Sequence, residues 1–543
     1  MMASSPFLGP KRPFVKTIII GAGFSGLAMG CKLKAVAKSD DFVIYDQADG
    51  AGGTWWANKY PGCGVDIPAV LYSLSFAPNP SFSRLFPKQK EILQYFNDVA
   101  DRFDVTRHFC FNIRWERAYW QDESSTWLVE MKDLTSGQAF QHECSVLISA
   151  VGGVSIPNIP KLQGMDGFEG DIVHTARWKD DLALKNKDVV VIGNGSSASQ
   201  LIPTIIKDAK SVTQFIRTPQ HYMKSQDRAV GSLWTLLFRF VPGLLRLIRA
   251  ATFLYLETSH AQFNLTRYGA EMRAKSLQLS DLYVRMTAPV KYWGLLTPAH
   301  DLGCKRRVFD NDNYLECLNR DNIHLTDDPI IAIEPRSVLT NSGLSYPADT
   351  IVFATGFSLS QFDSLLVGRY GYTREMHRKT YGTVEAFKTV AMAGFPNFFY
   401  ILGPHSGKGH TSTLYAAENF VDLILRVTKP IFEGKASSVE VKFAAEQRFH
   451  FEIQGALKNT VFTGLCNSWY IDGKTGKNWF IYPWNSLILW FSTHFGGGSD
   501  WTYNYNTRTK ANGFHFGILS VSTTVTILLL GRILLALVGT NKT

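Results

Sequence analysis

The chain has 543 residues, of which 45% are hydrophobic and 19% charged, and this balance excludes an intrinsically disordered protein. Its formal net charge of +10 comes from scattered Lys and Arg residues, which favours anionic ligands or a lipid surface over nucleic acid. The seven cysteines form neither a CxxC pair nor a zinc-binding spacing, which excludes a dithiol oxidoreductase and favours a reducing compartment. Length and composition together predict a folded, multidomain protein. Because no HExxH or facial-triad pattern is present, we expect that it requires no metal.

The first predicted element is a strand that runs into a glycine-rich turn and a helix, in VKTIIIGAGFSGLAMGCKLK (15–34). The turn has the spacing GxGxxG, in which glycines let the backbone approach a pyrophosphate held by helix N-terminal amides. A second strand, FVIYD, ends in an acid placed to bind a ribose hydroxyl pair. We expect dinucleotide contacts from Gly21, Gly23, Phe24, Ser25, Gly26 and Asp46.

The next stretch, GGTWWANKYPGCGVD (52–66), follows no helical or strand period. It gathers glycines and two tryptophans around a single carboxylate, Asp66, which either serves a reaction or merely caps a turn. The cofactor contacts expected here and just after it are Gly53, Thr54, Trp55, Asp66 and Tyr72.

A second strand, glycine turn and helix follows in DVVVIGNGSSASQLIPTII (188–206), with the spacing GxGxxA. The next predicted strand, VTQFIR, ends in Arg217 where the first site has an acid. Arginine there would bind a 2′-phosphate, which predicts NADPH, although a solvated surface arginine is the alternative. The contacts expected at this site are Gly193, Gly195, Ser196, Ser197, Ala198, Arg217 and Thr218.

Two such motifs predict an α/β fold with two dinucleotide-binding Rossmann-like domains, one for FAD and one for NADPH. The expected FAD-binding domain comprises 14–155 and 346–500, with the strand DTIVFATGF (349–357) in its second part. The expected NADPH-binding domain comprises 156–225 and 301–345, and a helical insertion fills 226–300. Apolar residues at helical spacing in 229–260 predict either a core helix or a face that rests on a membrane.

The last element, residues 516–539, is apolar and would be roughly 36 Å long as a helix, which exceeds the roughly 30 Å hydrocarbon core of a bilayer. Arg532 lies toward its end, where the side chain can reach the interface. We expect a single transmembrane helix, with a buried or surface-lying helix as the alternative. Because the N-terminus carries no secretory signal, the catalytic part should be cytosolic and the membrane that of the endoplasmic reticulum.

Two long patterns carry a resemblance to a known family. The segment FEGDIVHTARW has the form FxGxxxHxxxW, and residues 52–66 fit [AG]GxWxxxx[FY]P[GM]xxxD at every position. Together they closely resemble the signatures of Baeyer–Villiger flavin monooxygenases, over roughly residues 15 to 480. The family usually continues the first pattern with Pro or Asp, whereas this chain has Lys179.

The resemblance implies the roles of four residues. Arg306 matches the family's fixed cation, which stabilises the negative charge of flavin-activated oxygen, and Asp66 would orient that guanidinium. Lys305 would bind the 2′-phosphate together with Arg217. His174 is interpreted as orienting the linker between domains or making a structural hydrogen bond, and not as a base.

The expected reaction consumes NADPH and O2 and inserts one oxygen beside the carbonyl of a bulky apolar ketone, giving an ester or lactone. Such enzymes commonly serve polyketide or terpenoid biosynthesis. The alternatives are a related monooxygenase that hydroxylates a nucleophilic nitrogen, sulfur or carbon, and a catalytically silent flavin-binding scaffold. Oligomeric state and the identity of the ketone stay open.

Overall fold

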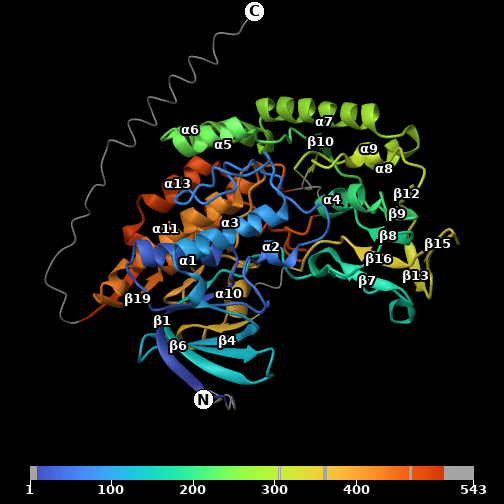
Figure 1. Ribbon diagram of the computed structural model, residues 1–543. Coiled ribbons are helices and arrows are strands. Elements are labelled where there is room, and N and C mark those ends of the chain that lie inside the picture. The colour runs from blue at the N-terminus through green and yellow to red at the C-terminus, as the bar shows by residue number, and fades with distance from the viewer. Residues whose placement is uncertain (1–8, 304, 306, 359–363, 464–467, 507–543) are drawn as a thin grey trace, which may run out of the picture.

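The computed structural model of the protein describes residues 9–303, 305, 307–358, 364–463 and 468–506 (Figure 1). Arg306 and the apolar segment 516–539 lie outside these residues. Within them, no helix is both long enough and apolar enough to cross a bilayer.

The first sheet has eight strands in the order β17-β4-β5-β6-β1-β2-β3, with β18 also paired to β6. The strands are β1 (Lys11–Ile20), β2 (Phe42–Tyr45), β3 (Phe109–Cys110), β4 (Ile113–Gln121), β5 (Thr126–Asp133), β6 (Ala139–Ser149), β17 (Leu365–Val367) and β18 (Phe398–Tyr400). Parallel pairing sets Ile20 beside Tyr45 and Ser149, and Ser149 beside Tyr400. The carboxyl ends of four strands therefore meet at one edge, where ligands bind in such sheets.

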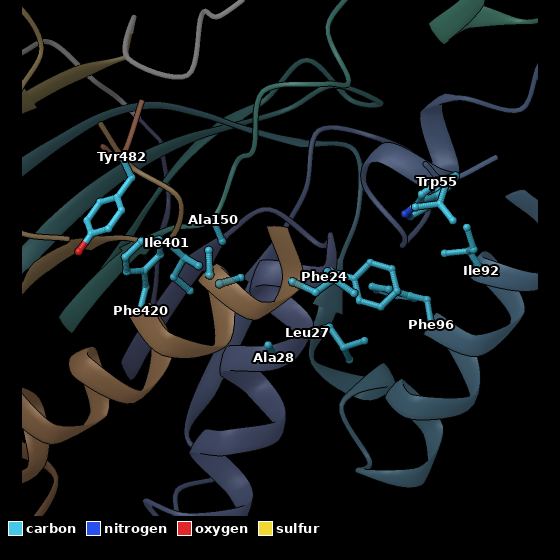
Figure 2. Packing of buried hydrophobic residues seen from close by; sticks show 14 of the residues in the cluster. Phe24, Leu27, Ala28, Trp55, Ile92, Phe96, Ala150, Ile401, Phe420 and Tyr482 are labelled. Atoms are coloured by element: carbon cyan, nitrogen blue, oxygen red, sulfur yellow. The ribbon is translucent and has the colours of Figure 1, made fainter. Parts of the chain in front are cut away.

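Three helices cover this sheet: α1 (Phe24–Ala35), α3 (Gln89–Arg102) and α11 (Thr413–Phe432). Helix α1 is buried on most of its circumference because it lies between the other two, as Figure 2 shows for Phe24, Leu27 and Ala28. The ring of Phe24 meets that of Phe96 edge-on at 5.2 Å. This packing fixes the N-terminus of α1 at the ligand-binding edge.

The second sheet is parallel and has the order β12-β9-β8-β16-β7. Its strands are β7 (Asp171–His174), β8 (Asp188–Ile192), β9 (Ser211–Phe215), β12 (Ile323–Thr326) and β16 (Thr350–Phe353), and α4 (Ser196–Ile205) follows β8. A hairpin sheet of β13 (Ile330–Glu334), β14 (Ser337–Thr340) and β15 (Ser345–Pro347) precedes β16.

The strand β16 differs from the prediction. It falls within 346–500, the expected second part of the FAD-binding domain, but it pairs with β7 and β8 in the second sheet. All four of its residues are buried, which a central parallel strand with both faces covered requires. The chain re-enters the first sheet only at β17, and the other predicted domain boundaries stay predictions.

The helical part of the chain leaves the second sheet region at β10 (Tyr222–Lys224) and returns at β11 (Val308–Asp310), and these two strands pair in parallel. It contains α5 (Ser232–Phe240), α6 (Leu244–Thr258), α7 (Arg267–Thr287) and α8 (Trp293–Leu296). Figure 1 shows α5, α6 and α7 along the edge of the molecule farthest from β1 and β6. The remaining elements are α2 (Thr54–Ala57), α9 (Tyr314–Cys317), α10 (Arg374–Tyr381), β19 (Ala436–Val441), α12 (Phe443–Leu457), α13 (Ser486–His494) and β20 (Trp501–Tyr505).

The segment 52–66 connects the first sheet region to α4 of the second. The hydroxyl of Tyr60 donates to Gln200 Oε1 at 2.7 Å, and Gln200 Nε2 donates to the Gly64 carbonyl at 3.0 Å. Gly62 has φ of +86°, and a Cβ atom there would lie 2.1 Å from the backbone oxygen of Gln200. Only a residue without a side chain permits this approach.

We expect Gly62→Ala to lower the urea midpoint of unfolding more than Gly434→Ala does. Both glycines have positive φ, so both substitutions add backbone strain of about 1–3 kcal/mol. A Cβ atom at Gly434 meets nothing within 4 Å among the described residues, whereas one at Gly62 displaces Gln200. Equal shifts of the two midpoints would contradict a tight contact between 52–66 and α4.

Candidate active site

The turn after β1 has the shape of a pyrophosphate cradle. A Cβ atom at Gly21, where φ is +114°, would lie 2.4 Å from the Ala150 carbonyl oxygen, and one at Gly26 would lie 2.0 Å from the Gly21 oxygen. Among the described residues, no side chain caps the N-terminus of α1. Its first amides are therefore free to bind an anion.

Asp46 follows β2 and lies against this turn. Its Oδ2 accepts the amide of Ala22 at 2.7 Å, and its Oδ1 accepts the amide of Ala48 at 2.8 Å. Burial raises the pKa of the Asp46 carboxyl, and these hydrogen bonds oppose that rise. The carboxylate is thus held beside the glycine turn, where the first dinucleotide's ribose was predicted.

Aromatic side chains form a wall next to the first turn. Trp55 is buried, and its Nε1 donates to the Tyr72 hydroxyl at 3.0 Å. Tyr72 also meets Phe24, the first residue of α1, edge-on at 6.2 Å. These rings lie next to the N-terminus of α1, where they would exclude water from a bound ring system.

Asn58 is a polar residue that the sequence analysis missed. Its Nδ2 donates to the carbonyls of Thr54 and Val154, both at 2.9 Å. Its buried Oδ1 finds no hydrogen-bond partner in the described part of the chain. An unpaired buried acceptor is costly, so this atom suits a donor on a bound ligand.

The turn after β8 repeats the first. A Cβ atom at Gly193, where φ is +121°, would lie 2.4 Å from the Ala354 carbonyl oxygen. A Cβ atom at Gly195, at the start of α4, would meet open space in the described structure, where no side chain caps that helix either. Ser196 and Ser197 begin α4, Ala198 is fully buried, and the Thr218 carbonyl accepts Asn194 Nδ2 at 2.8 Å.

Two cations gather at the second site. Arg217 is exposed just beyond the end of β9. The pKa of Lys305 is lowered, first by burial and then by the positive charge of Arg217. Each cation is thus within electrostatic reach of the other, in keeping with the predicted pair for a 2′-phosphate.

The chain beyond position 306 is held against the neighbourhood of Asp66. Asn311 Nδ2 donates to the Val65 carbonyl at 3.3 Å, and Asp312 pairs with Lys88, which also donates to the Gly62 carbonyl at 3.2 Å. Asp66 itself is half-buried. The segment that carries the two predicted cations therefore lies beside the segment that carries the predicted carboxylate.

The loop between β18 and α11 carries titratable side chains that are absent from the predicted catalytic set. Lys408 Nζ donates to the Trp484 carbonyl at 3.1 Å and lies 4.5 Å from the centre of the Tyr482 ring. His410 Nε2 lies 2.9 Å from Glu257 Oε1, on α6. Arg307, next to position 306, donates to the Gly409 carbonyl, which brings this loop to the same site.

Burial and pairing set the charges of this loop. Burial lowers the pKa of Lys408 to about 7, although the carboxylate of Glu257 opposes the change. Burial would raise the pKa of Glu257, but hydrogen bonds from His410 and Ser486 bring it down to about 2. At neutral pH Glu257 is therefore ionised and Lys408 is partly neutral.

The N-terminus of α11 points to the same edge of the first sheet. Two hydroxyls before this helix, Thr411 Oγ1 and Ser412 Oγ, are buried and have no hydrogen-bond partner among the residues described. Like Asn58 Oδ1, they fit the polar edge of a bound ring system. His405, in the same loop, pairs with the buried carboxylate of Glu385.

His174 ends β7 and makes local contacts. Its Nδ1 accepts the amide of Ala176 at 3.0 Å, and its ring meets that of Phe357 edge-on. Burial lowers the pKa of His174 to about 4, so the ring is neutral at physiological pH. A group this weakly basic is poorly matched to the work of a general base near pH 7.

We expect Lys408→Met to flatten the pH dependence of unfolding. Between pH 7 and the ordinary lysine pKa of 10.5, the unfolded chain binds more protons at this residue than the folded one does, so wild-type stability rises with pH. The variant should be more stable at pH 6.5, by up to about 4 kcal/mol, with a gap that closes toward pH 9.5. Urea midpoints across this range, with the surface variant Lys59→Met as the control, measure it. If the midpoints of wild type and Lys408→Met changed with pH in parallel, the lowered pKa of Lys408 would be contradicted.

Comparisons with known proteins identify the family. Residues 18–233 match the pattern of pyridine nucleotide-disulphide oxidoreductases. A Baeyer–Villiger monooxygenase of Pseudomonas aeruginosa is 31% identical over 471 residues, covering 86% of this chain and 87% of that protein. One of Streptomyces coelicolor is 32% identical over 476 residues, covering 86% and 89%.

Solved structures agree with the sequence relatives. The closed crystal structure of a cyclohexanone monooxygenase superposes with a TM-score of 0.77 at 25% identity, covering 92% of this chain and all of that one. An oxidized steroid monooxygenase bound to NADP has the same fold, with a TM-score of 0.77, 24% identity, and coverage of 91% of this chain and 100% of that one. Relatives above 30% identity over more than four-fifths of both chains place the protein in a family: it belongs to the Baeyer–Villiger-type flavin monooxygenases.

Proposed function

We propose that the protein binds FAD at the turn after β1 and NADPH at the turn after β8, and oxygenates a ketone with O2. The observation that carries the proposal is the position of residues 52–66. Gly53 lies against Gly23 of the first turn, where its Cβ atom would be 2.8 Å from the Gly23 Cα, and Gly62 lies against Gln200 of α4. One segment, with Asp66 at its end, thus spans both dinucleotide sites, as hydride transfer between two cofactors requires.

The residues at the first site have distinct roles toward FAD. The amides of α1 would hold the pyrophosphate and Asp46 the ribose. Trp55 and Tyr72 would wall the ring system, and Asn58 Oδ1 would accept one of its donors. When bound, the flavin would be reduced by the nicotinamide and would then activate oxygen.

Arg306 and Asp66 are the proposed catalytic residues. A fixed guanidinium in a water-excluding site stabilises negative charge that develops on the activated oxygen, and a neighbouring carboxylate keeps that guanidinium in place. The residues that flank positions 66 and 306 support this pairing. Asn311 donates a hydrogen bond to the carbonyl of Val65, next to Asp66, and Arg307 donates one to the carbonyl of Gly409. The expected outcome is one oxygen inserted beside the carbonyl, giving an ester or lactone.

Arg217 and Lys305 are proposed to select NADPH over NADH. No acid ends β9, so a 2′-phosphate meets two positive charges and no repulsion. At the first site, the acid at the corresponding position would repel such a phosphate.

The substrate is proposed to be a bulky apolar ketone of polyketide or terpenoid secondary metabolism. This rests on the apolar segment 516–539, which we propose to anchor the chain in the endoplasmic reticulum membrane with the catalytic part in the cytosol. Extraction of the protein from membranes by alkaline carbonate alone would contradict a spanning anchor.

The reaction is tested with NADPH, labelled O2 and a panel of polycyclic ketones. We expect a product heavier by one labelled oxygen. Arg306→Ala should lower its yield by about 100-fold or more, since a charge-stabilising donor contributes on that scale. The variant should still bind FAD, seen as yellow colour, and should still oxidise NADPH.

The surface variant Arg336→Ala, which removes an arginine paired with Glu169, is the control and should match the wild type. Unchanged product from Arg306→Ala would remove the proposed role of Arg306. Oxygen gained only by amines or sulfides, with no ketone converted, would indicate heteroatom oxygenation instead.

We expect Arg217→Ala to raise the KM for NADPH by about tenfold or more and the KM for NADH by less than about twofold. Loss of a hydrogen bond to a charged group has an effect of this size, and only NADPH carries the 2′-phosphate. Steady-state rates with each nucleotide, and Arg336→Ala as the matched control, measure the difference. Equal changes for both nucleotides would contradict the assignment.

A further inference from the structure

Helix α5 exposes apolar side chains in a way that soluble surfaces seldom do. Its sequence is SLWTLLFRF, and none of its nine residues is buried in the described structure. Leu233 is 65% exposed, Trp234 49% and Phe240 67%. A folded protein normally hides such residues or covers them with a partner.

The same exposure continues on α6 and α13. We define the apolar face as the exposed apolar side chains of these three helices together with Phe495, which follows α13: Leu233, Trp234, Leu236, Phe240, Leu247, Tyr255, Leu487, Ile488, Phe491 and Phe495. Contacts at their ends hold two of the helices together. Glu257, on α6, accepts the amide of Ser486 at the start of α13 at 2.8 Å, and His260 Nε2 lies 3.1 Å from the Pro483 carbonyl. Figure 1 shows α5, α6 and α13 at one corner of the molecule.

The exposed charges of α5 and α6 near the apolar face are positive, and the acid of α6, Glu257, faces inward to His410. Residues 229–256 contain three arginines and no Asp or Glu, and α13 contains no Asp or Glu either. Arg239 and Arg246 are exposed, whereas Arg249 points inward to the carbonyls of Val70 and Ser73. An apolar surface edged by cations complements the interface of an anionic membrane.

The place where the described chain ends supports a lipid surface over a second copy of the protein. Strand β20 follows α13 and ends at Tyr505, and the apolar segment 516–539 begins 11 residues later. That distance is at most about 36 Å of extended chain. A second copy would bring the same exposed arginines together, which opposes association.

We propose that the apolar face of α5, α6 and α13 lies in the interfacial region of an anionic membrane, as a contact separate from the segment 516–539. It does not depend on which cofactors or substrate the active site takes. The corner is held flat on the membrane by apolar burial and by attraction of Arg239 and Arg246 to lipid headgroups.

The test uses the full chain reconstituted into vesicles, with an environment-sensitive fluorophore on a cysteine introduced at Leu236 or Phe491. The matched control places it at Leu344, which is also strongly exposed but lies in the turn between β14 and β15. In phosphatidylcholine vesicles with phosphatidylserine, the labels at 236 and 491 should shift to blue emission and be quenched by brominated lipid. The label at 344 should show neither change, and wild type treated with the same reagent gives the background from native cysteines.

A second variant tests the charges without disturbing the core. Arg239→Glu with Arg246→Glu should weaken quenching at 491, so that a larger fraction of phosphatidylserine is needed for the same effect. Arg336→Glu should leave it unchanged. Aqueous emission at 236 and 491 on vesicles to which the protein is bound would overturn the proposal, because the segment 516–539 alone would then hold the protein. Blue emission without vesicles, rising with protein concentration, would overturn it in favour of a second copy.

Discussion

The approach of Gly62 to the carbonyl of Gln200 is the contact on which the arrangement of the active site depends. This close contact leaves no room for a side chain at position 62, so steric exclusion fixes the distance between residues 52–66 and α4. The same segment meets Gly23 at its other end through Gly53. Two glycine turns on two separate sheets are thereby held in register by one stretch of chain, with the half-buried Asp66 at its end.

The second feature of the site is that the charge of Glu257 is buried and compensated. Glu257 accepts hydrogen bonds from a backbone amide and from the His410 side chain, so it stays ionised away from water. Lys408 contacts a carbonyl oxygen and a ring face, and burial brings its pKa to about 7 although the Glu257 carboxylate opposes the change. A dry site strengthens each of these interactions, because little solvent screens them.

The sequence predicts the parts of this structure that local spacing determines. Strand, glycine turn and helix occur where GxGxxG and GxGxxA indicated, because the turn geometry excludes other residues. The sequence predicts the wrong domain for β16, which pairs with β7 and β8 of the second sheet. An apolar run indicates a buried strand but does not indicate which strands pair with it. The roles of Asn58 and Glu257 were invisible for a related reason: each depends on partners about 100 or more residues away in the chain. Of the two residues, only Asn58 has a feature in the sequence that could have drawn attention to it, since it is a polar residue within the family pattern at 52–66.

Helix α6 links the membrane contact to the chemistry. Its inner side places Glu257 against His410 and Arg249 against the carbonyls of Val70 and Ser73, while its outer side belongs to the apolar face. A helix that is restrained on one side by the active-site loop and on the other by lipid cannot move freely relative to either. Under the proposed function, an apolar ketone dissolved in the membrane would reach the protein at this corner without first crossing water, which avoids the cost of hydrating its surface.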